Sequence, residues 1–249
     1  MLLSIIIPAH NESKIISQTL NHVATLLPKH CEIIVVCDAC TDDTAIQAQK
    51  TKNVTIVTVN VKSAALARNA GAKVATGNYL LFLDADTLIV DVNTITQSID
   101  LLKQDVTIKV VGSYWHSKEE PEGSLVYLLL TNWFLYLTNT CPGFYLCCRK
   151  DEFIPFETKE KNEDIHWCKA MTQVCQNGRV HHFKEGEIET SMRRLKRQGL
   201  MKTLTFYATK QSCDMFFIVL FKIVIFVILF IVVAYFVHTM KMDSNFITL

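Results

Sequence analysis

The chain has 249 residues but only eight glycines, and the first of them is Gly71. A glycine-rich loop after the first predicted strand is therefore absent. This excludes a G-x-G-x-x-G dinucleotide fingerprint or a Walker A phosphate loop at that position. If the chain binds a nucleotide, it does so without a glycine-rich cradle for the phosphates. The net charge of +1 also gives no reason to expect nucleic acid as a partner.

The cysteines do not form a recognisable framework. There are nine, an odd number with irregular spacing, in a chain too long to be a disulfide miniprotein. Cys37 and Cys40 form a C-x-x-C pair, but the sequence has no second such pair to complete a structural zinc site. We expect reduced thiols that pack as small hydrophobic side chains in a cytosolic domain.

The most informative motif that is present is Asp84-Ala85-Asp86, which follows the apolar run Tyr79–Leu83. The run predicts a buried strand, and residues two positions apart on a strand point to the same side. Converging carboxylates repel each other unless a cation lies between them, and Mg²⁺ or Mn²⁺ suits oxygen ligands and bridges to substrate phosphates. Asp-x-Asp also occurs in turns and helix caps, where the carboxylates accept backbone N–H groups.

Up to residue 111, short apolar runs alternate with stretches of helical spacing. The predicted strands are Leu2–Ile7, Glu32–Cys37, Val54–Val59, Tyr79–Leu83 and Val106–Val111, and the predicted helices are Ser13–Leu27, Asp42 or Asp43 to Lys50, Ala64–Ala75 and Asn93–Leu102. This alternation predicts an α/β fold with a mostly parallel sheet and helices on both faces. Ligands of such sheets bind beyond the carboxyl ends of the strands, where Ala9-His10-Asn11, Asp38 and Asp84-Ala85-Asp86 all stand.

The second half of the chain is less regular. Leu125–Leu137 is apolar and aromatic but too short to span a bilayer, so it is either a helix that covers the core or an interfacial helix. Further predicted elements are strands at Phe144–Cys148 and Val180–Phe183, a helix at Ile165–Val174, and a basic amphipathic stretch at Met192–Thr209.

A membrane span is predicted near the end of the sequence. Phe216–Val237 is apolar except for Lys222, and its 22 residues would reach about 33 Å as a helix, against a bilayer core of about 30 Å. A buried core helix is the alternative. Basic residues precede the run and only Lys241 follows it, so the positive-inside rule places the large domain in the cytoplasm. We therefore expect a catalytic domain at 1–200, a juxtamembrane amphipathic segment at 201–214, a transmembrane helix at 215–238 and a tail at 239–249.

Together these motifs resemble family-two glycosyltransferases of the GT-A fold, over about Leu3 to Leu200. The matching segments are Ser4–Glu12 for the opening strand and loop, Val35–Thr44 for the nucleotide loop, Ala67–Gly71 followed by Gly77–Asp86, Asn162–Asp164 for the acidic base motif, and Ser191–Gly199 for a basic segment of membrane-associated members. Two positions depart from the family pattern. Cys37 stands where an aspartate is usual, and His10 stands at a common tyrosine position.

The resemblance implies a nucleotide-sugar donor, with a UDP-sugar favoured over a GDP-sugar, and Mg²⁺ or Mn²⁺ as the cofactor. Asp86, with Asp84, is expected to hold the metal. The residues expected at the donor are Pro8, Ala9, Asn11, Glu12, Asp38, Arg68, Asp84 and Ala85. The residues themselves leave two of these open, because Arg68 also suits an exposed helix position and Asp38 also suits a cap or Asx turn before Thr41.

Asp164 is the expected catalytic base, and a base opposite the leaving group implies inversion at the anomeric carbon. Its alternative is an N-cap of the following helix. The helix dipole lowers the basicity of a carboxylate at that position, whereas burial beside Glu163 raises it. The residues expected to contact acceptor or phosphate are Glu163, Arg193, Arg194 and Arg197. Whether His181 or His182 touches the metal is left open.

The sequence thus indicates a membrane-anchored, cytosol-facing, metal-dependent inverting glycosyltransferase. A lipid-linked acceptor is one option, since a tethered active site meets bilayer substrates directly. A nucleotidyltransferase of similar architecture is a rival, but such enzymes usually carry a glycine-rich basic loop after the first strand. The second rival is a non-catalytic, membrane-tethered protein that binds nucleotide sugars.

Overall fold

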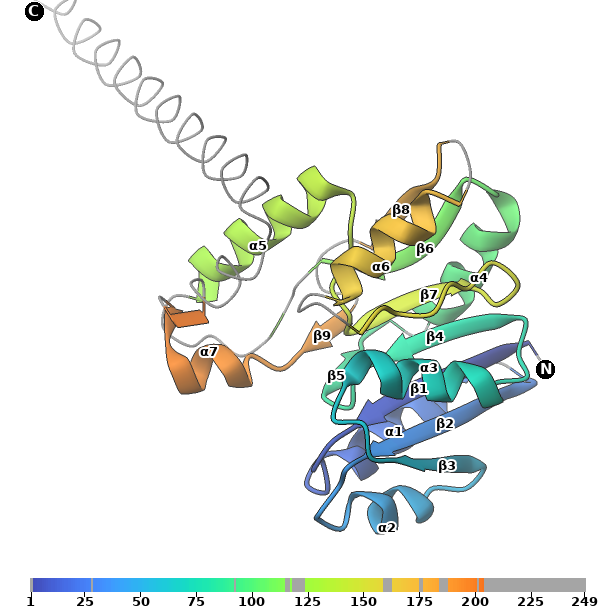
Figure 1. The fold of residues 1–249 in the computed structure, drawn as a ribbon, viewed down its shortest axis with the longest axis vertical. Coiled ribbons are helices and arrows are strands. Elements are labelled where there is room, and N and C mark those ends of the chain that lie inside the picture. Colours follow the sequence, from blue (N-terminus) through green and yellow to red (C-terminus); the bar gives the residue numbers. More distant parts are fainter. Residues whose placement is uncertain are drawn as a thin grey trace, which may run out of the picture. The chain divides into compact units, whose positions relative to one another are not determined.

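The computed structural model describes residues 2–27, 29–91, 93–114, 117, 124–158, 163–174, 177–183, 188–200 and 202–203, apart from the side chains of Val126 and Arg194 (Figure 1). These residues belong to one compact unit that ends at Thr203. Its elements in chain order are β1 (Leu3–Ala9), α1 (Ile16–Leu26), β2 (Cys31–Asp38), α2 (Thr44–Gln49), β3 (Val54–Val59), α3 (Ala64–Val74), β4 (Tyr79–Leu83), β5 (Thr87–Ile89), α4 (Thr94–Gln104), β6 (Ile108–Ser113), α5 (Ser124–Thr138), β7 (Tyr145–Arg149), α6 (Glu163–Thr172), β8 (Arg179–Phe183), β9 (Ile188–Thr190) and α7 (Arg193–Gln198).

Within the described residues, seven strands form one sheet in the order β3-β2-β1-β4-β7-β6-β8. Strands β3, β2, β1 and β4 run parallel to one another, as do β6 and β8. The expected α/β fold with a mostly parallel sheet is therefore confirmed. Strand β7 is antiparallel to both β4 and β6, and β5 pairs with β9 in a separate antiparallel ribbon. Neither feature was predicted, because an apolar run shows that a strand is buried but not which way it points.

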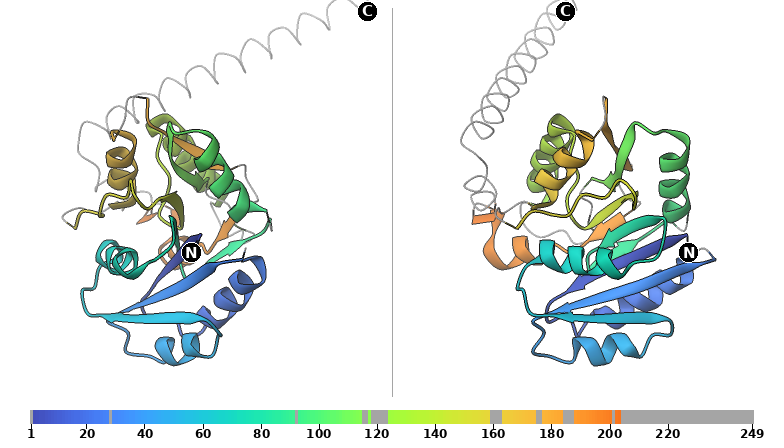
Figure 2. Two further views of the ribbon diagram at one scale, coloured as in Figure 1. Left: turned by 90° about the vertical axis from the view of Figure 1, so that its right-hand side faces the viewer. Right: turned by 45° about the vertical axis from the view of Figure 1, so that its right-hand side comes forward.

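Helices cover both faces of the sheet, and Figure 2 shows α1 and α3 on opposite sides of it. On one face, Leu20 of α1, Ala48 of α2 and Ile99 of α4 pack in the same hydrophobic cluster as Ile5 of β1. On the other face, residues of α3 and α6 belong to the hydrophobic cluster that contains Ile6 of β1, with α3 over β1 and α6 over β6. Successive residues of a strand point to opposite faces, so β1 contributes apolar side chains to both clusters.

The predicted amphipathic stretch from Met192 is helical over α7, and the described residues Leu200, Lys202 and Thr203 are helical again after Gly199. The helix ends at Gly199, whose φ of 76° lies in the left-handed region that favours glycine. Met192 and Leu195 are buried, so one side of α7 packs against the unit. Except for residues 202–203, the segments predicted at 201–214, 215–238 and 239–249 lie outside the described residues. In the part that is described, no helix has the length and hydrophobicity needed to cross a membrane.

We predict that Gly71→Ala destabilises the fold. A Cβ atom at Gly71 would lie 2.3 Å from Cγ2 of Ile6, because α3 packs closely on β1. Alanine is favoured over glycine in a helix by about 1 kcal/mol, but overpacking costs about 1–3 kcal/mol. Thermal unfolding of the full chain should show a midpoint several degrees lower. Lys73→Ala, at an exposed position of the same helix, is the control. Equal midpoints for the two variants would show that α3 can move away from the sheet at little cost.

Candidate active site

The polar clusters that follow β1, β2 and β4 lie at one edge of the sheet. Ala9 of β1 is in register with Cys37 of β2, directly before Asp38, and Ile6 is in register with Phe82 of β4. Because all three strands are parallel, the segments after them meet at the carboxyl edge. This is the edge at which the sequence placed the candidate site.

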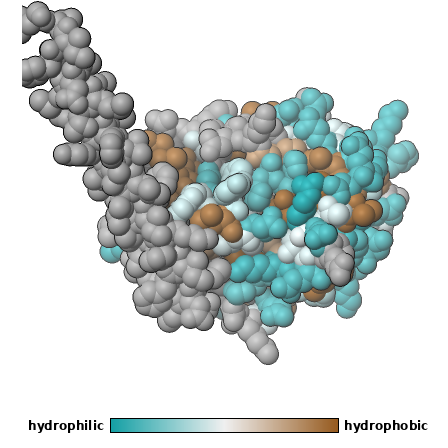
Figure 3. Space-filling model, turned by 90° about the horizontal axis from the view of Figure 1, so that it is seen from above, coloured by the Kyte–Doolittle hydropathy of each residue, from teal (hydrophilic) through white to brown (hydrophobic). Residues whose placement is uncertain are grey.

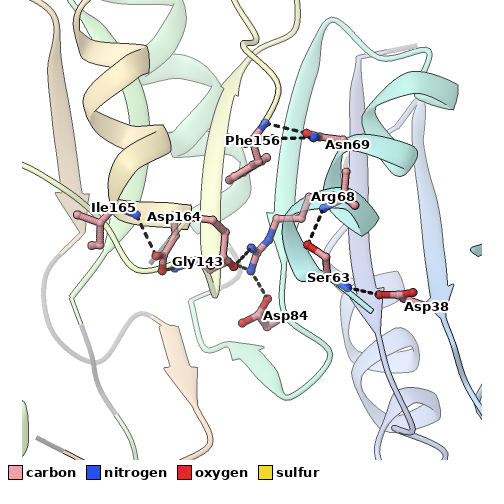
Figure 4. A network of polar contacts seen from close by, with 11 residues as sticks. Asp38, Ser63, Arg68, Asn69, Asp84, Gly143, Phe156, Asp164 and Ile165 are labelled. Carbon is pink, nitrogen blue, oxygen red and sulfur yellow. Dashed lines mark hydrogen bonds and ion pairs between the residues drawn. The ribbon is translucent and has the colours of Figure 1, made fainter. Parts of the chain in front are cut away.

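Arg68 of α3 is the centre of the first cluster (Figure 4). Its side chain is only 4% exposed, and its guanidinium lies 3.0 Å from Asp84 Oδ1 and 3.1 Å from Glu163 Oε1. Nη2 also donates to the carbonyl of Gly143 at 3.3 Å, and the guanidinium lies over the ring of Phe156. The alternative of an exposed helix arginine is therefore wrong. A buried guanidinium needs such partners, because an unpaired buried charge is very costly.

Asp164 is held in the first turn of α6, as its second residue. Oδ2 accepts the N–H of Gly143 at 2.7 Å, and Oδ1 accepts the N–H of Ile165 at 2.9 Å. Asp164 is thus not the N-cap that precedes the helix, although its bond to Ile165 has a capping character. Desolvation raises the pKa of Asp164, and the neighbouring Glu163 adds to this effect, whereas Arg68 and the backbone N–H groups oppose it. Burial therefore outweighs the helix terminus, and the carboxylate is more basic than usual.

Gly143 brings the arginine and the aspartate together. A Cβ atom at this position would lie 2.7 Å from Arg68 Nη2 and 3.2 Å from Asp164 Oδ2. Any other residue would push one of these two side chains away. The peptide of Gly143 accepts from one and donates to the other, so Asp84, Arg68, Gly143 and Asp164 form one continuous network.

Opposing effects act on the pKa of Asp84. Desolvation and the nearby Asp86 raise the pKa of Asp84 to about 6, although Arg68 favours its charged form. Ala85, between the two aspartates, has its side chain in the core, and its carbonyl accepts a bond from Thr19. The motif forms a turn after β4, in which Thr87 donates its N–H to the Asp84 carbonyl, and the carboxylates of Asp84 and Asp86 pair with different arginines.

Asp86 belongs to a second cluster, centred on Arg193 of α7. Nη1 of its guanidinium donates to Glu12 Oε2 at 2.9 Å, and Nη2 donates to both Glu12 Oε1 and Asp86 Oδ2 at 2.8 Å. The side chain of Arg193 is 55% exposed, unlike that of Arg68. Glu12 follows β1 and Asp86 follows β4, so one cation joins two loops of the sheet edge to α7. Burial raises the pKa of Asp86, and Arg193 opposes this shift.

The carboxylates suit a divalent metal that arrives with phosphate ligands. Mg²⁺ is commonly held by one or two carboxylates together with substrate phosphates, rather than by a complete protein cage. Asp86 and Glu12 provide such oxygens, provided that Arg193 turns away. Across the described ranges, no three histidine, cysteine or acidic side chains converge on a ready-made metal site.

His181 and His182, the two histidines considered as metal contacts, each interact with another group. His182 Nε2 lies 2.9 Å from the carbonyl of Thr140, and its ring stacks on Tyr114 at 4.5 Å between centroids. His181 packs edge-on against Phe183. The structure thus gives each of these two rings a partner of its own.

Asp38 shapes the loop that follows β3. It is buried, and its carboxylate accepts the backbone N–H groups of Val61, Lys62 and Ser63 at 2.7–2.8 Å. This is neither a helix cap nor an Asx turn before Thr41, so that alternative is wrong. The three bonds use most of the acceptor sites of the carboxylate. Contact with a nucleotide base stays a prediction for this residue.

The remaining residues predicted at the donor, acceptor or phosphate differ in how exposed they are. Ala9 is buried, so it offers only backbone to the edge, and Pro8 beside it is partly exposed. Asn11 has a φ of 55° and accepts the N–H of Thr41 at 2.8 Å, which joins the loops after β1 and β2. Arg197 is exposed on α7. The side chain of Arg194 lies outside the described residues.

Two residues at this site were missed from the sequence. Asn69 Nδ2 donates to the carbonyl of Phe156 at 2.9 Å, and its Oδ1 accepts the N–H of Phe156 at 2.8 Å. The ring of Phe156 stacks on Trp167 of α6 at 4.6 Å between centroids. This pair fixes the loop after β7 against α3 and α6. Asn69 follows Arg68 in the segment Ala67–Gly71, which resembles the family motif, so there was a reason in the sequence to consider it. No local sequence pattern distinguishes Phe156.

Asp84→Asn is expected to change how stability depends on pH. The ordinary pKa of an aspartate is about 3.9, and that of Asp84 in the folded protein is about 6. The stability that this group contributes is therefore full below about pH 4 and is lost as the pH rises through about 6. Urea unfolding between these pH values should show a steeper loss for the wild type than for Asp84→Asn. Asp100→Asn, at an exposed position of α4, should behave as the wild type does; identical slopes for all three proteins would contradict the prediction.

Comparison with known proteins identifies relatives. The sequence model described as Glycosyl transferase family 2 matches residues 4–164. The UDP-Glc:alpha-D-GlcNAc-diphosphoundecaprenol beta-1,3-glucosyltransferase WfaP of Escherichia coli is 33% identical over 121 residues, which cover 47% of this chain and 48% of WfaP. The glycosyltransferase GlyG of Streptococcus pneumoniae is 27% identical over 144 residues, which cover 55% of this chain and 44% of GlyG. The chain spans about half the length of these curated relatives.

A solved structure shows the same fold. The mannosyltransferase PcManGT from Pyrobaculum calidifontis, in complex with GDP-Man and Mn²⁺, is similar with a TM-score of 0.62 at 19% identity. The similarity covers 82% of this chain and 64% of PcManGT. At this identity the likeness concerns the architecture, and it confirms the GT-A-like arrangement of sheet and helices.

Proposed function

This chain belongs to glycosyl transferase family 2, and from this premise we propose that it is a metal-dependent, inverting glycosyltransferase with a nucleotide-sugar donor. A UDP-sugar is the favoured donor. The observation that carries the proposal is the network from Asp84 through Arg68 and Gly143 to Asp164, because it ties the acidic motif at the sheet edge to a basic carboxylate on α6. Family membership also counts against the rival nucleotidyltransferase.

Asp164 is the base in this proposal. The acceptor hydroxyl loses its proton to the Asp164 carboxylate while its oxygen bonds to the anomeric carbon of the sugar. The bond from that carbon to the nucleotide diphosphate breaks, and the diphosphate takes the electron pair. Attack from the side opposite the diphosphate inverts the anomeric centre. The raised pKa of Asp164 favours proton uptake, and its two backbone bonds fix the direction of the carboxylate.

In this proposal, the negative charge on the departing diphosphate is stabilised at the second cluster, which contains Arg193, Glu12 and Asp86. Asp86 and Glu12, with Asp84 nearby, would hold a divalent ion, which would supply positive charge that stabilises this leaving group. Arg193 occupies the same carboxylates through an exposed side chain. An Arg193 side chain released from these carboxylates would suit phosphate oxygens, because its forked donors match them.

A lipid-linked acceptor and a cytoplasm-facing, membrane-anchored location complete the proposal. Support for the acceptor comes from WfaP, whose name specifies a diphosphoundecaprenol-linked substrate. Support for the anchor comes from the apolar run Phe216–Val237 and the basic residues before it. Glu163 and Arg197 lie on α6 and α7, at the two elements that bring Asp164 and Arg193 to the edge.

Asp164→Asn is predicted to lower sugar transfer by about 10²- to 10⁴-fold, because general-base catalysis contributes on this order. Binding of the UDP-sugar, measured by thermal shift with Mn²⁺, should be retained. Asp151→Asn, at an exposed loop position, should keep full activity. Undiminished transfer by Asp164→Asn would remove the proposed base. Undiminished transfer by the wild type in excess chelator would remove the metal, and binding without any turnover would favour the non-catalytic rival.

Arg193→Gln is predicted to tighten the binding of Mn²⁺ to the donor-free protein. Loss of an exposed ion pair of about 0.2–1 kcal/mol corresponds to a gain of up to about five-fold in affinity. Electron paramagnetic resonance of free Mn²⁺ measures this directly and does not depend on catalysis. Lys196→Gln, at an exposed position of the same helix, should leave the affinity unchanged, and Asp86→Asn should weaken it. Unchanged or weaker binding in Arg193→Gln would show that the arginine does not compete with the metal.

A further inference from the structure

Helix α5 is unusual for the surface of this unit. Its fifteen residues, SLVYLLLTNWFLYLT, include no charged side chain. A helix that is apolar around its whole circumference is normally buried in a protein or in a membrane. In Figure 1, α5 lies at the periphery of the described unit, away from the strands of the sheet.

One side of α5 is nevertheless exposed. Leu125 is 68% exposed, Leu129 is 62% exposed and Tyr136 is 70% exposed. With 3.6 residues per turn, these three positions fall within about 40° around the helix axis. Tyr127 and Leu135 point to the other side, and each is only 3% exposed. The three exposed residues, which we name the α5 stripe, therefore lie on one side of the helix, with the partly exposed Asn132 between Leu129 and Tyr136. The face of the molecule in Figure 3 is mostly hydrophilic between scattered hydrophobic patches.

We propose that the α5 stripe docks into the interface of a lipid bilayer. The inference rests on the membrane location proposed above, and not on the sugar-transfer chemistry. Leucine and tyrosine are suited to this position, because apolar faces enter the acyl boundary and aromatic rings favour the headgroup level. Because α5 carries no charged side chain, a folded protein partner could form no ion pair with it. A bilayer needs no ion pair at the acyl boundary.

Two observations favour a bilayer over other occupants. Lys196, Arg197 and Lys202 are exposed in and just after α7, which suits anionic headgroups. Only twelve residues separate Thr203 from the apolar run Phe216–Val237, and twelve residues reach at most about 40 Å, so a membrane span there would keep the unit close to the bilayer. Three side chains also offer much less area than the roughly 800 Å² per partner of a stable dimer.

A short segment of chain connects α5 to the candidate active site. The helix ends at Thr138, and Gly143 follows five residues later. The peptide of Gly143 holds both Arg68 and Asp164. A docked α5 therefore keeps the loop that orients the proposed base close to the headgroup level, where the diphosphate of a lipid-linked acceptor lies.

The test uses the full chain in nanodiscs of phosphatidylcholine with a minority of phosphatidylglycerol. Trp133 lies on α5 and is partly exposed, so its emission reports on lipid that reaches the helix. The difference between the wild type and Trp133→Phe isolates this emission from that of Trp115 and Trp167. Brominated phosphatidylcholine should quench the difference signal. Leu125→Glu/Leu129→Glu/Tyr136→Glu should lose this quenching, while Ile46→Glu/Val106→Glu, at exposed apolar positions elsewhere, should retain it.

The outcomes separate the inference from the proposed function. Hydrolysis of the nucleotide sugar in detergent should be equal in the wild type and in both charge variants, because none of the substituted residues lies at the site. A wild-type Trp133 signal that brominated lipid does not quench would overturn the inference even if that hydrolysis is normal. Two chains per nanodisc with an unquenched signal would instead identify a second copy as the occupant. Unquenched signal with one chain would identify the chain's own C-terminal segment.

Discussion

The structure depends on the burial of one guanidinium. Arg68 lies between the sheet and α6, and it pairs with Asp84 from the end of β4 and Glu163 from the start of α6. A charge in this position is tolerated only while its partners stay in place, so the ends of two elements are fixed by the same cation. The orientation of Asp164 follows through Gly143. Folding and the geometry of the site are thus set by one electrostatic constraint.

The second arginine works in the opposite way. Arg193 is exposed and reaches its carboxylates from a short helix that comes more than a hundred residues after Asp86. Buried and exposed arginines hold carboxylates with different permanence, because water screens and replaces the exposed contacts far more easily. The site therefore has two parts. The buried cluster around Arg68 is fixed and aligns the proposed base. In the exposed cluster around Arg193, another cation could replace the arginine beside Asp86, so that the negative charge of the carboxylate stays neutralised.

Much of the fold and part of the site could be predicted from the sequence. The hydrophobic runs located β1 to β4 and β6 to β8 but not the short strands β5 and β9, and the Asp-x-Asp motif was expected at the correct edge because it directly follows such a run. The direction of β7, the burial of Arg68 and the pairing of Glu12 with Arg193 were not predictable. Each depends on contacts between distant residues, as does the use of Asp38 to hold the loop at Val61–Ser63. Local patterns carry no information about such partners.

The place of β7 in the sheet has a consequence for synthesis on the ribosome. Strands β1 to β4 are neighbours in space and are complete by residue 83, but β7 must then enter beside β4 from a point more than sixty residues later. Domains generally begin to fold from the N-terminus as they emerge. A nascent chain therefore carries an uncovered β4 edge, with Asp84 at its end, until the β7 segment appears. Slow translation of the segment between β4 and β7 prolongs the exposure of that edge.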